Sequence, residues 1–122
     1  MTTAPNKNRD QSTSNLATAL RARETLANKD KWCTGYRHRD GRMCLVGHIL
    51  QALGAQTRAE HYKDSKEPNF VYDEEKLGQL EQIVESLGFA TAHCAENFND
   101  SNGNHQQILN RFDQGLVHWK DA

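Results

Sequence analysis

Apolar residues recur at helical spacing in four separate blocks of this chain, and this pattern constrains the fold more than any other feature. Spacings of three and four residues place such side chains on one face of a helix, where they can be buried together. The every-second-residue alternation of a half-buried strand is absent from these blocks. The pattern therefore predicts helices over residues 14–28, 43–54, 73–88 and 104–118.

The ends of these blocks carry residues that commonly begin and end helices. Side chains able to accept hydrogen bonds from the first amides of a helix stand at three starts: Thr13 or Ser14, Asp73 and Asn104. Gln107 follows Asn104 at the spacing of a capping box. Gly54 and Gly88 fit helix stops, and Phe89 after Gly88 suits a Schellman motif.

The remaining segments are predicted as connections. Residues 29–42 form a loop, residues 55–72 hold at most one helical turn near Arg58 that ends by Pro68, and the conformation of residues 89–100 stays open. Residues 1–12 are polar and are expected to form a disordered tail. The fold class is therefore all-α, a single small irregular domain of four main helices over residues 13–122.

The apolar stripes also predict which side chains form the core. The expected core members are Leu20, Leu45, Ile49, Leu80, Val84, Ile108 and Phe112. On the second helix, Cys44, Gly47, His48 and Gln51 lie opposite the apolar stripe. The acidic residues of the third helix are expected to face solvent: Glu74, Glu75, Glu81 and Glu85.

Charge and cysteine content limit the partners and the cellular compartment that are expected for this chain. Fifteen Lys and Arg against sixteen Asp and Glu leave a net charge of −1, so no global field draws the chain to nucleic acid or an anionic membrane. Three cysteines lack the paired spacing of a disulfide framework and indicate free thiols in a reducing compartment. No apolar run suits a signal peptide or a membrane span, so a cytoplasmic location is expected.

Residues 29–42, here called the basic aromatic loop, are the first candidate binding site. They run into the start of the second helix and hold these candidate ligand-binding side chains: Trp32, Tyr36, Arg37, Arg39 and Arg42, with His48 further along. Helix amides, guanidinium groups and a stacking ring could hold a phosphate, a nucleotide or an acidic protein segment. Asp30 and Asp40 reduce the local charge, and a solvated loop pinned by a buried Trp32 fits the sequence equally well.

A second candidate is catalytic. Cys44 stands in the first turn of a predicted helix near several arginines, which would lower the pKa of its thiol and make it the most reactive of the three. His105 could act as acid and base, with Asn99 or Asp100 orienting its ring, in a hydrolase or transferase. The alternative is a buried structural thiol beside an ordinary turn and helix cap.

A metal site was the third possibility. Cys44 and His48 stand four residues apart, and His93 and Cys94 could complete a tetrahedral zinc site. Adjacent residues such as His93 and Cys94 seldom bind one ion together, and no Cys-x-x-Cys pair is present. The sequence therefore predicts neither a metal nor a cofactor.

Two patterns resemble a known family. They are Trp32-x-x-Gly35 followed by Gly41-x-x-Cys44-x-x-Gly47, and Phe98-Asn99-Asp100 followed by His105 and an apolar helix. Over residues 16–116 they are similar to an uncharacterised family of small actinobacterial and bacteriophage proteins of unknown function. Met43 and His48 stand where that family often has Trp and Ala. The resemblance implies a phage-related origin and the domain limits, and it implies no activity.

These observations lead to two functional hypotheses. The first is a small helical accessory or phage-host interaction protein that binds a protein partner or an anionic ligand through the basic aromatic loop. Nucleic acid remains open as a partner on local charge alone, and a membrane is not expected. The second is the Cys44 hydrolase or transferase. The sequence also predicts that the two motif regions meet in space and share one site, which holds Trp32, Cys44, Asn99, Asp100 and His105.

Overall fold

Five α-helices make up most of the computed structural model, which describes residues 7–39, 41–55, 57–59, 68–70, 73–102 and 104–119. In chain order the helices are α1 (Lys7–Leu26), α2 (Leu45–Ala52), α3 (Glu74–Ser86), α4 (Ala92–Asn102) and α5 (His105–Val117). A 3-10 turn, η1 (Lys29–Lys31), follows α1, and a short antiparallel pair, β1 (Thr57–Ala59) and β2 (Pro68–Phe70), lies between α2 and α3.

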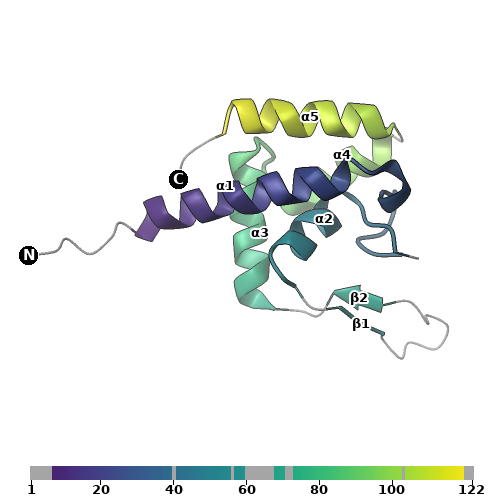
Figure 1. Cartoon of the computed structure of the whole chain (residues 1–122), viewed down its shortest axis with the longest axis horizontal. Helices are drawn as coiled ribbons and strands as arrows, with labels where there is room; N and C mark the ends of the chain where they lie inside the picture. The colour runs from purple at the N-terminus through teal and green to yellow at the C-terminus, as the bar shows by residue number, and fades with distance from the viewer. Residues whose placement is uncertain are drawn as a thin grey trace, which may run out of the picture.

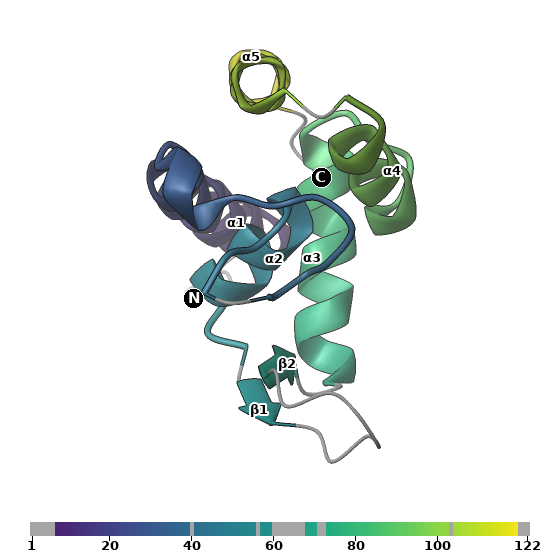
Figure 2. The ribbon, with the colours of Figure 1, turned by 90° about the vertical axis from the view of Figure 1, so that its right-hand side faces the viewer.

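The helices are arranged irregularly around one core. Helices α1 and α5 run side by side in opposite directions, and α3 crosses them steeply (Figure 1). An ion pair of 2.6 Å between Arg23 and Asp113 joins α1 to α5. The loop between η1 and α2 extends across the end of the molecule to α4, as the end view shows (Figure 2). This loop carries the candidate site.

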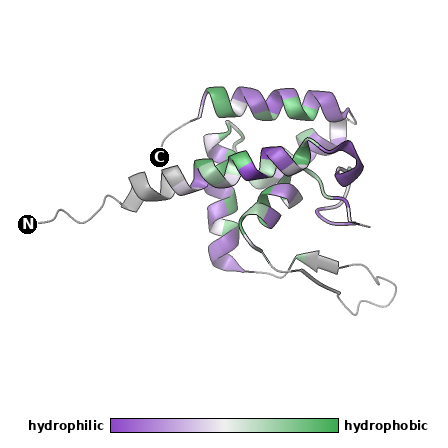
Figure 3. Cartoon of the chain, viewed as in Figure 1, coloured by the Kyte–Doolittle hydropathy of each residue, from purple (hydrophilic) through white to green (hydrophobic). Residues whose placement is uncertain are grey.

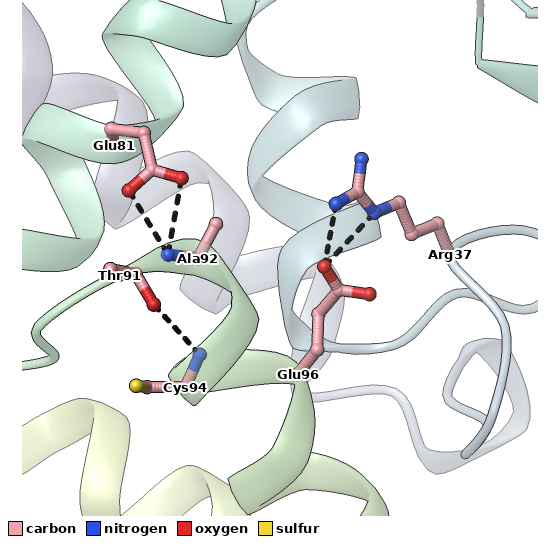
Figure 4. A network of polar contacts seen from close by, with 6 residues as sticks. All are labelled: Arg37, Glu81, Thr91, Ala92, Cys94 and Glu96. Atoms are coloured by element: carbon pink, nitrogen blue, oxygen red, sulfur yellow. Dashed lines mark hydrogen bonds and ion pairs between the residues drawn. The ribbon is translucent and has the colours of Figure 1, made fainter.

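The all-α class is confirmed, but the predicted count of four main helices is one too low. Helix α4 fills much of the segment whose conformation the sequence left open. Its first amide, Ala92 N, donates to the Glu81 carboxylate at 3.1 and 3.2 Å, and Cys94 N donates to Thr91 Oγ1 at 3.1 Å (Figure 4). Glu81 belongs to α3, so it is a helix cap and not merely the solvent-facing residue that the sequence predicted.

Helix α1 differs most from its prediction. It begins at Lys7, so the expected disordered tail is wrong from that residue onward and Thr13 and Ser14 are not N-caps; residues 1–6 lie outside the described part. Leu20 is 52% exposed and is not a core residue. The buried face of α1 instead consists of small and polar residues: Asn15, Thr18, Ala19 and Ala22, followed by Leu26.

The other predicted core residues and caps agree with the structure. Leu45, Ile49, Leu80, Val84, Ile108 and Phe112 are all buried. Asp73 caps α3 and Asn104 caps α5, each accepting from two backbone amides. At the end of α3, Gly88 adopts φ +96° and Phe89 N donates to Val84 O at 2.9 Å, which is the predicted Schellman closure.

Two further features bear on the site. Residues Thr57–Ala59 form strand β1 and not part of the one helical turn that the sequence allowed near Arg58; residues 60–67 lie outside the described part. The first part of α2 is buried on both faces, because Cys44, Gly47 and His48 are as inaccessible as its apolar stripe, whereas Gln51 near its end is exposed. Among the described helices, none is long and apolar enough to cross a membrane.

Candidate functional site

The side chain of Asn99, on α4, holds together the two sequence regions that resemble the family. Its Oδ1 accepts from Trp32 Nε1 at 2.7 Å and from Leu45 N at 3.1 Å. Its Nδ2 donates to Cys33 O and to Asp100 Oδ1, both at 3.1 Å. A side-chain amide has two acceptor positions and two donors, so this fully buried residue uses all four. The prediction that the two regions meet is confirmed for Trp32, Asn99 and the start of α2.

Three residues on one face of α4 fix the basic aromatic loop. Besides Asn99, Asp100 accepts from Gly35 N at 2.7 Å, and Glu96 pairs with Arg37 at 2.6 Å (Figure 4). Spacings of three and four residues bring these side chains to one side of the helix. Arg37, expected to bind a ligand, is therefore engaged inside the protein.

The two arms of the loop also pair with each other through backbone hydrogen bonds. Met43 N donates to Lys31 O at 2.8 Å, and Cys33 N donates to Met43 O at 3.1 Å. Arg39 and Arg42 exchange hydrogen bonds of 2.7 and 2.8 Å. Helix α2 approaches the loop so closely at Gly47 that a Cβ there would clash with the carbonyl oxygen of Arg37.

His48 supports the same loop from α2. Its Nε2 lies 2.9 Å from Lys31 O, and its Nδ1 lies 2.9 Å from Thr25 Oγ1 on α1. Burial is the main cause that lowers the pKa of His48. The predicted ligand-binding role of His48 has little support here, because both ring nitrogens are bonded within the protein. His48 lines a separate hollow of about 550 Å³ together with His38 and Gln51.

Cys44 lies directly before α2 and is 2% exposed. Burial raises the pKa of its thiol to about 12, so the lowered pKa predicted from the helix terminus and the nearby arginines is wrong. Tertiary packing covers this face of α2, and Asn99 already occupies Leu45 N. The start of α2 is thus not an open anion site, although the sequence allowed one.

His105 begins α5 and is 9% exposed. Its Nε2 lies 2.6 Å from Leu26 O, and its ring packs against Trp32 with 5.4 Å between centroids. Asn99 and Asp100 bind Trp32 and the loop backbone, and no hydrogen bond among the described residues links either of them to His105. The catalytic roles predicted for Cys44, His105, Asn99 and Asp100 therefore gain no support from this geometry.

The loop presents an open hollow of about 840 Å³ on its outer side. Its lining residues are Lys29, Asp30, Trp32, Cys33, Thr34, Tyr36, Arg39 and Arg42. The Arg39 guanidinium lies 4.5 Å from the centroid of the Tyr36 ring. Three cationic side chains and one carboxylate share this lining, so it is positive although the whole chain is not. We call it the basic hollow.

The considered metal ligands do not assemble in the described structure. His93 and Cys94 are exposed on α4, whereas Cys44 and His48 are buried at α2. Among the described residues, no three His, Cys, Asp or Glu side chains are grouped so that they could hold an ion.

Sequence reasoning missed Glu96, which holds the loop through its ion pair with Arg37. Glu96 stands three and four residues before Asn99 and Asp100, and this helical spacing was the available signal.

Together these features define a small all-α domain in which one face of α4 fixes a basic loop between α1 and α2. The chain belongs to the family of unknown function DUF6197, whose family profile matches residues 11–116. Comparison with curated proteins and with solved structures gives no significant match.

Proposed function

We propose that this protein is a binding module whose basic hollow receives an anionic ligand or an acidic segment of a protein partner. The observation that carries the proposal is the lining of one hollow by Lys29, Arg39 and Arg42 beside two aromatic residues. Guanidinium groups form paired, charge-assisted hydrogen bonds with phosphates and carboxylates.

Rigidity of the loop supports the proposal. Asn99, Asp100 and Glu96 hold the loop from α4, and His48 and Gly47 hold it from α2. A loop that is ordered before binding loses little conformational entropy when a ligand arrives. In this function the residues that looked catalytic position the loop and do not react.

A titration followed by amide chemical shifts tests the proposal. Inorganic pyrophosphate and a hexaglutamate peptide serve as probes, with wild type and an Arg39→Ala, Arg42→Ala double variant. We expect at least one probe to shift the amides of residues 29–45 in the wild type and to lose this effect in the double variant. Arg37 is not substituted in the double variant, because it is ion-paired with Glu96.

Arg21→Ala with Lys76→Ala is the matched control, since it removes two charges from side chains outside the basic hollow. Retained binding by this control, with binding lost in the double variant, supports the proposal. Binding that is equal in all three proteins contradicts it.

A phage-host role in the cytoplasm is a finer part of the proposal. It is supported by the resemblance described above and by three free cysteines, which suit a reducing compartment. The partner is then a host protein with an acidic segment. Pull-down from a candidate host with the same three proteins tests this, and the double variant should fail to retain the partner.

A further inference from the structure

The basic hollow combines two kinds of group, and a nucleotide can use both at once through its phosphate and its base. One is a pair of arginines, and the other is a pair of aromatic residues. We propose that the ligand of this hollow is a nucleotide, with its phosphate at Arg39 and Arg42 and its base against Tyr36. This inference rests on the proposed function and specifies its ligand.

The arginine pair is arranged to hold one multiply charged group. Arg39 and Arg42 are directly opposite each other in an antiparallel bridge closed by hydrogen bonds of 2.7 and 2.8 Å. Residues opposite each other in such a pair project to the same face, and both arginines line the hollow. The lining also includes Lys29 and Asp30, so it holds three cationic side chains and one carboxylate, and the Asp100 charge acts on Cys33 within it.

The aromatic groups are fixed beside this charge. Trp32 is held through its Nε1 by Asn99 at 2.7 Å, and its ring packs on His105. Tyr36 is 50% exposed, and the Arg39 guanidinium rests over its ring. Flat bases stack on such rings and on guanidinium planes without requiring a particular sequence.

The dimensions of the hollow agree with a small ligand. Its volume of about 840 Å³ lies within the range of sites for small molecules and cofactors. A smaller hollow of about 410 Å³ shares Lys29 and Trp32 with it and reaches Asn104 and Gln106 at the start of α5.

Calorimetric titration with the four nucleoside 5′-monophosphates tests the inference, with the matching nucleosides, inorganic phosphate and hexaglutamate as comparisons. We expect a nucleotide to bind more tightly than its nucleoside and than phosphate. Arg42→Ala should weaken this binding by roughly tenfold or more, and Tyr36→Leu should weaken nucleotide binding by several-fold but leave phosphate binding unchanged. Arg21→Ala, at an exposed position outside the hollow, should match the wild type.

Thiol labelling provides a second readout on the unmodified chain. Cys33 lines the hollow, and Cys94 is exposed elsewhere on α4. A bound nucleotide should slow alkylation of Cys33 and leave Cys94 unaffected. If hexaglutamate binds in an Arg42-dependent way and no nucleotide binds, the inference that the ligand is a nucleotide is wrong, and the proposed function still holds. Failure of every probe to bind in an Arg42-dependent way overturns both.

Discussion

Asn99 illustrates how a single buried amide can determine the shape of a binding loop. Its four hydrogen bonds join the loop, α2 and α4, and each donor or acceptor position has one suitable partner. In Asn99→Asp an oxygen replaces the Nδ2 donor and faces Cys33 O and the Asp100 carboxylate. Leaving these groups unpaired in a buried place should cost about 2–4 kcal/mol of the free energy of unfolding.

Urea denaturation of Asn99→Asp measures this cost, and Asn110→Asp on the exposed side of α5 is the matched control. The control should remain close to the wild type. An Asn99→Asp variant as stable as the control would show that this network does not hold the loop.

Cys44 should be the least reactive of the three thiols, although the sequence suggested that it would be the most reactive. Cys94 is exposed, burial and the Asp100 charge raise the pKa of Cys33, and burial raises that of Cys44 to about 12. At about pH 8 only the thiolate reacts, so alkylation should be fastest at Cys94 and slowest at Cys44. Mass spectrometry of each peptide checks the order. Equal labelling of Cys44 in folded and urea-unfolded protein would contradict it.

His48 should make the fold sensitive to mild acid. Its folded pKa is below the ordinary value of 6.5, mainly because of burial. As the pH falls through about 6.5 the unfolded chain takes up a proton that the folded chain does not, so stability decreases until the folded pKa is passed. The loss of Tm between about pH 7 and pH 5 should be smaller in His48→Gln than in wild type.

His93→Gln serves as the control for this measurement because His93 is exposed. It should lose Tm with falling pH as the wild type does. If Tm falls with decreasing pH as steeply in His48→Gln as in the wild type, another group causes the acid sensitivity.

At the scale of whole elements, burial in α1 depends on which face of the helix a residue occupies and not only on its hydrophobicity. Ala19 and Ala22 allow α1 to lie close to α2, whereas Leu20 stays 52% exposed. Leu20→Ala should therefore change the free energy of unfolding by less than about 1 kcal/mol. Ile49→Ala in α2 should cost about 2–5 kcal/mol. Urea titration compares the two, and equal losses would contradict this assignment of the core.

Helices whose start is capped by their own sequence were predictable, as Asp73 and Asn104 show for α3 and α5. Helix α4 was not predicted: Thr91 caps it from its own sequence, but its first amide is bonded by Glu81 of another helix, and the sequence does not reveal that contact. The meeting of Trp32 and Asn99 followed from polar residues that broke the apolar pattern. The raised pKa of the Cys44 thiol could not be predicted from the sequence, since burial depends on packing between distant segments.

Hydropathy along the whole molecule shows why a chain with few apolar residues can still fold. Hydrophobic residues make up 36% of the chain, and η1 with much of the adjoining loop is hydrophilic (Figure 3). The described apolar side chains nevertheless form one core to which every α-helix contributes. The loop adds polar hydrogen bonds to this core through α4, so its stability should be linked to that of the helices.

This link predicts that the loop unfolds together with the helices and not before them. The chain has two tryptophans, so in Trp119→Phe the fluorescence reports Trp32 in the loop alone. Trp32 donates a hydrogen bond to buried Asn99. If the loop detached, the buried Asn99 side chain would lose this partner, and leaving a buried polar group unpaired is costly. In urea, the Trp32 fluorescence and the helical circular dichroism of this variant should change with the same midpoint and slope. A fluorescence transition at clearly lower urea would show that the loop melts independently, and the preorganised binding surface proposed for it would then be lost.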